Sequence, residues 1–471
     1  MKFKPYPKYK ASGVEWLGDV PHAWEIVPFK REIERNDGGA WGDEPDAETG
    51  TLTVVLRSTE QTADGQWNIN DPAMRKLSNT ELAGSLLAEG DLVVTKSSGS
   101  SLHIGKTTLV SADVAKLGCC YSNFMQRIRL RRSSVPKFVW YVMNNDISRS
   151  QFDLLSNSTT GLANLNSTMI GELKLSIPPV EEQSTIATFL DLETAKIDTL
   201  IAKQEKLIDL LKEKRQAVIS HAVTKGLDPT VPMKPSGVEW LGDVPEHWIH
   251  RRIRFCASLN PSKSEISHLA RNYEVSFLPM EAIGDDGKLR LDITKAISDV
   301  EYGYTYFRNG DITIAKITPC YENGKGGFMD GLTNGIGFGT TELIVVRPNS
   351  QTNGLFLKWL FESKLFRKIG EGYMYGAGGQ KRVPDDFVRN FAISWPPLTE
   401  QQEIVAYLDK VTAKIDILIA KAQQAIALQK EHRTALISAA VTGKIDVRNI
   451  ACKAVDKRST QKFNKVQHAN I

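Results

Sequence analysis

The chain has 471 residues, of which 24% are charged and 41% hydrophobic. This length predicts two to four domains, and the apolar fraction excludes global disorder. No run of about 18 apolar residues is present, so we expect no membrane-spanning helix. The N-terminal segment lacks the apolar core of a signal peptide. Five cysteines, two of them adjacent (Cys119 and Cys120), favour neither a disulfide framework nor a zinc site. We therefore expect a soluble, reduced protein of the cytoplasm.

The formal net charge is only +4. A protein that binds DNA over its whole surface is usually more basic. If this chain binds DNA, its basic residues must cluster locally, or a partner must share the phosphate contacts.

The first motif in chain order is Ser-Gly-Val-Glu-Trp-Leu-Gly-Asp-Val-Pro-His-Ala-Trp at 12–24. It recurs at 236–248 with 11 identities in 13 positions. We predict that Trp16 and Trp240, one from each copy, pack within a repeated frame. Such self-similarity indicates a duplicated half-molecule rather than a solenoid, whose repeat would be 20–50 residues long.

The segment after the first motif alternates strand-like and helix-like runs, which predicts a mixed α/β domain. Strands are expected at 51–56, 91–95, 125–130 and 173–177, and an amphipathic helix at 135–146. Pro178-Pro179 then ends the last strand and precedes a helix start.

A long helical segment follows, and Gly226 is placed to cap its C-terminus. Residues 178–224 repeat at 396–442 with 27 identities in 47 positions. Apolar residues recur at spacings of three and four in both copies, as expected for helices that need a partner. This stripe comprises Ile197, Leu200, Ile201, Leu207, Ile208, Leu211, Val218, Ile219 and Ala222, with Ile415, Leu418, Ile419, Ala422, Ala425, Ile426, Leu436, Ile437 and Ala440 in the second copy.

The second half repeats this order around a divergent domain. Strands are predicted at 275–278, 311–315, 343–346 and 391–395, and a helix at 356–368. Thr399 and Gln402 form a candidate capping box at the start of the second long helix, and Gly443 a C-terminal cap. We predict that the two long helices pair with each other and that each spans roughly 66 Å, at 1.5 Å per residue.

These patterns predict an α+β fold in which two mixed α/β domains are joined by a pair of long helices in an internally duplicated arrangement. The expected segments are a first domain (1–176), a central helical region (177–230), a second domain (231–394), a distal helical region (395–447) and a basic, flexible tail (448–471). No catalytic constellation is found. The run from Gly99 to Thr107 has five residues between its glycines where a P-loop has four, and the eight histidines show no metal-binding spacing.

The 13-residue motif, the Pro-Pro-x-x-Glu-Gln helix starts at 178–183 and 396–401 and the Lys-Ile-Asp-x-Leu-Ile helices resemble the DNA-specificity (S) subunit of type I restriction–modification systems. The resemblance covers nearly the whole chain, twice and in order. It implies a non-catalytic subunit in which long antiparallel helices join two target-recognition domains in a pseudo-two-fold arrangement. Each domain reads one half of a bipartite, asymmetric site on double-stranded DNA, while the helices set the spacer.

The resemblance further implies two modification subunits, which methylate adenine with S-adenosylmethionine, and two restriction subunits, which use ATP and Mg²⁺ for translocation and cleavage. No cofactor, metal or membrane partner is expected for this chain itself. The alternative is the specificity scaffold of a type IIG-like or orphan methylation system.

Reading base edges requires polar or basic side chains on exposed loops. Two loops in each domain meet this condition. We expect DNA contacts from Lys96, Ser97, Ser98, Ser100, Ser101, His103, Ser158, Thr159 and Asn164 in the first domain, and from Lys316, Thr318, Tyr321, Asn323, Lys325, Tyr375, Gln380, Lys381 and Arg382 in the second. Alignment of the frames places Asn164 opposite Arg382, which predicts that these loops are equivalent.

Overall fold

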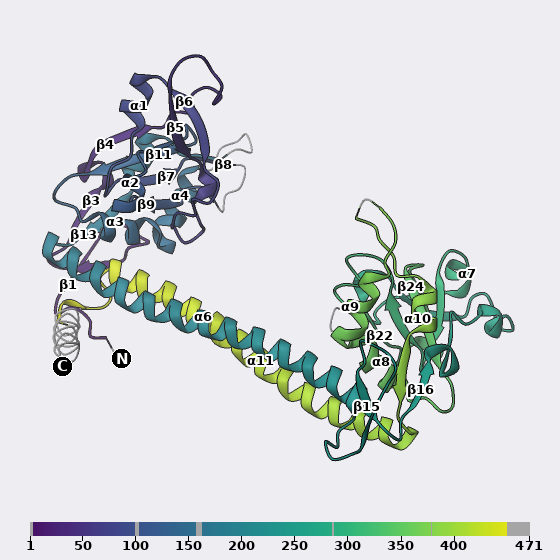
Figure 1. Ribbon diagram of the computed structural model, residues 1–471. Coiled ribbons are helices and arrows are strands. Elements are labelled where there is room, and N and C mark those ends of the chain that lie inside the picture. The colour runs from purple at the N-terminus through teal and green to yellow at the C-terminus, as the bar shows by residue number, and fades with distance from the viewer. Residues whose placement is uncertain (1–2, 99–102, 157–162, 285–286, 378, 450–471) are drawn as a thin grey trace, which may run out of the picture. The chain divides into compact units, whose positions relative to one another are not determined.

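A computed structural model describes residues 3–98, 103–156, 163–284, 287–377 and 379–449 (Figure 1). The chain divides into two compact units: unit 1 comprises Met1–Lys203 and Ala425–Ile471, and unit 2 comprises Gln204–Gln424. Both mix helices and sheets, so the predicted fold class is confirmed. No helix in the described ranges is long and apolar enough to cross a membrane.

Unit 1 is built on a four-stranded sheet of order β4-β11-β7-β9, in which all neighbours are antiparallel. A three-stranded sheet of order β10-β5-β6 lies beside it in the same unit (Figure 1). Strands predicted at 51–56, 91–95, 125–130 and 173–177 appear as β5, β7, β11 and β13. The strands of unit 1 are β1 (Tyr9–Ala11), β2 (Asp19–Pro21), β3 (Glu25–Pro28), β4 (Ile33–Gly38), β5 (Thr51–Leu56), β6 (Ala73–Leu77), β7 (Leu92–Thr95), β8 (Ser97–Ser98), β9 (Thr107–Leu109), β10 (Cys120–Tyr121), β11 (Met125–Leu130), β12 (Ala163–Asn164) and β13 (Lys174–Ile177).

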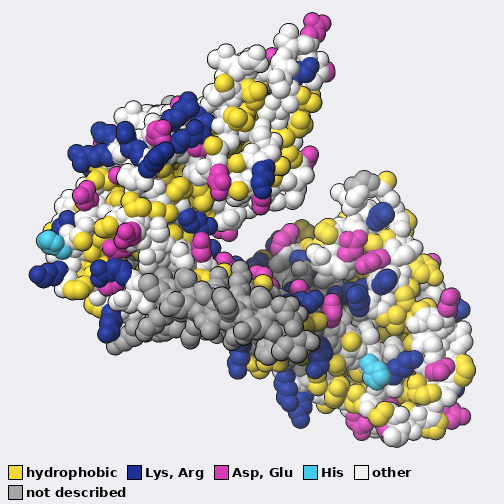
Figure 2. All heavy atoms as spheres, turned by 60° about the vertical axis from the view of Figure 1, so that its left-hand side comes forward, with side chains coloured by type: hydrophobic (Ala, Val, Ile, Leu, Met, Phe, Trp, Pro, Cys, Tyr) yellow, Lys and Arg dark blue, Asp and Glu magenta, His cyan; other side chains and the backbone are white. Residues whose placement is uncertain are grey.

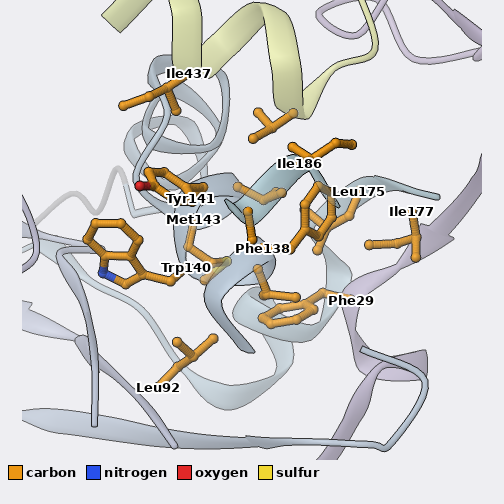
Figure 3. Close-up of a cluster of buried hydrophobic side chains, with 14 of the residues drawn as sticks. Phe29, Leu92, Phe138, Trp140, Tyr141, Met143, Leu175, Ile177, Ile186 and Ile437 are labelled. Atoms are coloured by element: carbon orange, nitrogen blue, oxygen red, sulfur yellow. The ribbon is translucent and has the colours of Figure 1, made fainter. Parts of the chain in front are cut away.

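The core of unit 1 joins this sheet to the long helices. Its short helices are α1 (Asn79–Ser85), α2 (Ala112–Ala115), α3 (Pro136–Met143), α4 (Asp146–Ser156) and α5 (Ser167–Glu172). Figure 3 shows Phe138 and Met143 of α3 between Leu92 of the sheet and Ile186 and Ile437 of the long helices. All five side chains are buried, so sheet, short helix and helical frame share one core.

Unit 2 repeats this plan. Its first sheet has the order β17-β24-β21-β22, which matches the four-stranded sheet of unit 1 strand for strand, and a second sheet has the order β19-β18-β23-β20. Strands predicted at 275–278, 311–315, 343–346 and 391–395 appear as β18, β21, β24 and β25. The strands of unit 2 are β14 (Met233–Pro235), β15 (Asp243–Pro245), β16 (Ile249–Arg252), β17 (Ala257–Leu259), β18 (Glu274–Leu278), β19 (Thr294–Ala296), β20 (Thr305–Arg308), β21 (Ile312–Ala315), β22 (Gly326–Phe328), β23 (Ile336–Gly339), β24 (Leu343–Pro348) and β25 (Ala392–Trp395).

The short helices correct two predictions. Unit 2 contains α7 (Ile297–Val300), α8 (Gly354–Glu362), α9 (Lys364–Gly372) and α10 (Asp385–Asn390). The single helix expected at 356–368 is interrupted at Ser363, whose side chain caps α9 by accepting the N–H of Phe366. The helix expected at 135–146 likewise ends at Met143, before α4 begins at Asp146.

The two long helices are α6 (Val180–Lys225) and α11 (Leu398–Val441). Gly226 and Gly443 follow them with φ of 77° and 71°, the left-handed geometry of a C-terminal cap. The capping-box prediction for Thr399 is wrong, because this residue already lies inside α11.

The predicted pairing of the helices is confirmed within each unit. In unit 1, Arg433 of α11 binds Asp198 of α6, with Nε and Oδ1 2.9 Å apart. In unit 2, Arg215 of α6 lies 3.5 Å from Asp416 of α11. Each partner occupies the equivalent position of the repeat, so the duplication preserved the ion pair. Most of the stripe is wholly or partly buried, but Leu200, Leu207 and Leu418 are 43–50% exposed.

The repeated motifs form the joint between each domain and the helices. Trp24 and Trp248 are fully buried, and their indole N–H groups donate to Glu182 at 3.0 Å and Glu400 at 3.1 Å. The packing predicted for Trp240 is confirmed by its stacking on Phe391. The prediction for Trp16 is wrong, because 45% of this residue is exposed.

Two further contacts fix each joint. Lys444, just after α11, donates to the carbonyls of Leu17 and Asp19, and Lys225, at the end of α6, donates to those of Leu241 and Asp243. At the other side of each joint, Gln183 and Gln401 are fully buried and bind main-chain atoms of their domains. Each domain is thus held by the start of one long helix and the end of the other.

Candidate nucleic-acid interface

A buried ion pair fixes the central strand of each unit. Asp91, which precedes β7, accepts two hydrogen bonds of 2.7 Å from Arg129, and Asp311, which precedes β21, accepts the same two from Arg347. Both aspartates are at most 1% exposed. Bidentate pairs of this kind hold the strands rigidly, so the loops that follow β7 and β21 leave from fixed points.

The loop after each central strand is tied to a second, distant segment. In unit 1, β8 pairs with β12, which sets Ser97 opposite Asn164, and the Leu165 N–H binds the Lys96 carbonyl at 2.8 Å. In unit 2, Ile317 pairs with Arg382, and the Val383 N–H binds the Lys316 carbonyl at 2.8 Å. The backbone contacts therefore support the predicted equivalence of the two loop pairs.

The structure describes only some of the residues of unit 1 that are predicted to contact DNA. Lys96 and Ser97 are partly exposed and His103 is exposed. The backbones of Ser98 and Asn164 belong to β8 and β12. Four predicted residues lie outside the described residues, namely Ser100, Ser101, Ser158 and Thr159.

A neighbouring lysine is not available to a phosphate. The Nζ of Lys106 donates to the carbonyls of Ser58 and Gln61, at 3.2 and 2.9 Å, and the side chain is 4% exposed. Burial lowers its pKa, and so does the charge of Arg149. A P-loop lysine must reach bound phosphates, so the burial of Lys106 is a further argument against the P-loop interpretation of the sequence from Gly99 to Thr107.

In unit 2, three of the residues predicted to contact DNA make hydrogen bonds that stabilise the fold. Tyr321 is 2% exposed and its hydroxyl donates to the Phe366 carbonyl at 3.2 Å. Burial raises the pKa of this phenol above its ordinary value. Lys325 donates to the Met280 carbonyl at 3.2 Å, and the Thr318 hydroxyl binds the Gly379 carbonyl and the Lys381 N–H. These side chains hold the loops in place.

The remaining predicted residues of unit 2 are at the surface. Asn323, Tyr375, Gln380 and Lys381 are exposed, whereas Lys316 and Arg382 are partly exposed. Bridges from Arg382 to both Ile317 and Tyr375 bring the two loops together. This group of polar, aromatic and basic side chains can contact both base edges and phosphates.

Two residues at the interface were not predicted from the sequence. Glu342 binds Arg382, and Phe124 occupies the equivalent position in unit 1, where it is 58% exposed. The N–H of Lys316 donates to the Glu342 carbonyl, just as that of Lys96 donates to the Phe124 carbonyl. Each lies directly before a strand of the central sheet, Phe124 before β11 and Glu342 before β24. This position before a predicted strand was the one feature of the sequence that could have identified the two residues.

Glu342 and Arg382 each shift the pKa of the other. Hydrogen bonding from Arg382 lowers the pKa of Glu342, and the positive charges of Arg382 and Lys316 add to the effect. Hydrogen bonding to Glu342 in turn raises the pKa of Arg382. Both groups are therefore charged at neutral pH. On the face drawn in Figure 2, Lys and Arg side chains gather in patches with acidic side chains between them.

The fold and this surface define a protein with two equivalent mixed α/β units on a frame of long helices. In each unit, backbone hydrogen bonds tie the segment after the central strand to a second, distant segment. Residues 77–209 and 262–427 match the family described as the type I restriction modification DNA specificity domain. These stretches make up more than half of the chain and occur once in each half. The chain belongs to this family.

Individual relatives agree with this assignment. The type I restriction enzyme EcoAI specificity subunit of Escherichia coli is 44% identical over 179 residues, which are 37% of this chain and 30% of that protein. The chain thus matches less than a third of the length of that relative. The putative type I restriction enzyme MjaX specificity subunit of Methanocaldococcus jannaschii is 22% identical over 92% of this chain and 96% of its own.

Solved structures share the fold. The HsdS subunit from Thermoanaerobacter tengcongensis superposes with a TM-score of 0.53 at 16% identity, over 90% of this chain and 98% of its own. A chain from a structure of the type I R-M system reaches a TM-score of 0.60, also at 16% identity, over 90% and 99%.

Proposed function

We propose that this chain is the sequence-specific DNA recognition subunit of a type I restriction–modification complex. Unit 1 reads one half of a bipartite site on double-stranded DNA and unit 2 reads the other. The observation that carries the proposal is the duplicated loop pair, because Ser97 opposite Asn164 and Ile317 opposite Arg382 build one platform twice, with different side chains. Two similar platforms with different chemistry are what an asymmetric bipartite site requires.

The helical frame then sets the spacer between the half-sites. Half-sites about one turn apart, roughly 34–36 Å, present their grooves to the same side of the duplex. The continuous helices α6 and α11 are long enough for this role. The domain limits proposed from the sequence (1–176, 177–230, 231–394, 395–447 and 448–471) assign the readers and the spacer regions accordingly.

The chain acts in the cytoplasm with partners that supply the chemistry. Two modification subunits bring S-adenosylmethionine, and two restriction subunits bring ATP and Mg²⁺. Leu200 and Leu418, at equivalent positions of the repeat, are both about half exposed. Because the frame is duplicated, it presents such equivalent positions twice, which supports two copies of one partner. The alternative of a type IIG-like or orphan scaffold is not favoured, since the relatives reported above are named as type I specificity subunits.

The test is an exchange of one reader. Residues 249–394 are replaced by the equivalent segment of a related subunit, the chain is co-expressed with modification subunits, and methylated adenines in the host DNA are mapped by sequencing. One half-site should change while the other half and the spacer remain. The matched control exchanges 25–172 and should change only the other half. Absence of any bipartite motif, or a change of both halves in one exchange, would contradict the proposal.

A further inference from the structure

Arg382 and Glu342 form an ordered pair at the surface of unit 2. The arginine Nε donates to Oε2 at 2.9 Å and Nη2 donates to Oε1 at 2.8 Å. Their side chains are 37% and 24% exposed. Two parallel bonds fix the plane of the guanidinium as well as its position.

The backbones of both residues are anchored to the same neighbouring segment. Arg382 exchanges two hydrogen bonds with Tyr375, of 2.8 and 3.1 Å, and the next residue, Val383, is 1% exposed. Lys316 binds the Glu342 carbonyl through its N–H and the Val383 N–H through its carbonyl. The pair is therefore preorganised, and little side-chain entropy remains to be lost on binding.

The pair leaves one edge of the guanidinium open. Arginine has five N–H donors. The bonds to Glu342 use Nε and one hydrogen of Nη2, and no described residue accepts a hydrogen bond from Nη1. The edge formed by Nη1 and the second hydrogen of Nη2 can donate two parallel hydrogen bonds to a single partner.

We infer that Arg382 reads a guanine in the half-site of unit 2, and that Glu342 is the positioning residue that holds it. This inference rests on the proposed function. Two parallel donors match the O6 and N7 acceptors of guanine in the major groove. A phosphate is the weaker candidate, because Glu342 already neutralises the charge that would attract it.

The adjacent Lys381 provides the contrast. It is exposed, and its Nζ has no ion-pair partner among the described residues. A free ammonium on a flexible chain suits a phosphate. Unit 1 carries Phe124 and Asn164 at the positions of Glu342 and Arg382, so its half-site is not read by the same pair.

The experiment uses the full chain in complex with its modification subunits. The motif that the complex methylates is used as the DNA, with guanine or 7-deazaguanine in the unit 2 half-site. Binding is measured for the wild type and for Arg382→Ala, Glu342→Gln and Lys381→Ala. 7-Deazaguanine lacks the N7 acceptor. At one guanine, it should weaken the wild type roughly 5- to 150-fold and leave Arg382→Ala nearly unaffected. Glu342→Gln should lose part of the same discrimination, and thermal melting should show all variants folded.

Lys381→Ala should weaken all sequences alike and reduce the salt slope by about one. The inference is overturned if the unit 2 half-site has no G·C pair, if 7-deazaguanine has no effect on the wild type at any position, or if Arg382→Ala keeps the full preference. The substituted DNA tests the wild-type protein, so a misfolded variant does not remove the test. Absence of a bipartite motif would overturn the proposed function as well, whereas an intact motif with no guanine contact overturns the inference alone.

Discussion

The joint between domain and frame makes a quantitative prediction about two tryptophans of one motif. Trp24 is fully buried, contacts Tyr6 edge-on and donates to Glu182, whereas Trp16 is 45% exposed. Trp24→Ala removes a large core side chain and a buried hydrogen bond, which together cost about 3–5 kcal/mol. Trp16→Ala should stay within about 0.5 kcal/mol, as is usual for surface substitutions.

For a unit of this size, 1 kcal/mol shifts the melting temperature by about 2–4 °C. Trp24→Ala should therefore lower the transition of unit 1 by roughly 6–20 °C, and Trp16→Ala by less than about 2 °C. Differential scanning calorimetry of the purified chain measures both. Two units need not melt together, so transitions are assigned with Trp248→Ala, which should shift the transition of unit 2. Equal shifts for Trp24→Ala and Trp16→Ala would refute the assignment of the joint.

Two further predictions concern the helices and the surface ion pair. Four helical residues inserted beside Arg215 in α6, and four beside its partner Asp416 in α11, add about 6 Å of helix. The methylated motif should therefore gain one or two base pairs of spacer, with unchanged half-sites. An unchanged spacer in an active complex would show that these helices do not set the spacer. The depressed pKa of Glu342 means that its contribution to stability is complete above the ordinary value of 4.5 and is lost as the pH falls through the lower value in the folded protein. The difference in melting temperature between the wild type and Glu342→Gln should accordingly be constant near neutral pH and shrink as the pH falls below 4.5, and a difference that does not shrink with falling pH would contradict this.

Most of the fold could be predicted from the internal repeats and from the periodicity of the apolar residues. The strand Thr51–Leu56 was predicted with the bounds of β5, because a short run of Thr, Val and Leu is typical of a strand and is a local pattern. The helix interruption at Ser363 was missed, because Ser363 looks like an ordinary polar residue until its hydroxyl is seen to cap α9. Trp16 and Trp24 are the same residue type in one motif, and only tertiary packing distinguishes the exposed one from the buried one.

The surface was predicted less completely than the fold. Composition identified Arg382 and Lys381 as polar loop residues, but it also selected Tyr321, which the fold buries. Glu342 was missed because an acidic residue is a poor DNA ligand by itself. Its role appears only when a residue 40 positions away in the chain is brought beside it.

The contacts of the joint explain how one frame can carry two different domains. Gln183 accepts the N–H of Val135 and Gln401 that of Asn353, both at 2.8 Å, although the two bound residues have unrelated side chains. The lysines at the C-terminal ends of the long helices, Lys225 in α6 and Lys444 just after α11, likewise bind carbonyl oxygens. Main-chain atoms are present whatever the domain sequence is, so selection on the frame residues leaves the domains free to diverge. The repeats are therefore strongest where the helices hold the domains and weakest where the loops face outward. A domain exchanged at these joints keeps the same main-chain contacts, which is the physical reason to expect that one half-site can be replaced without the other.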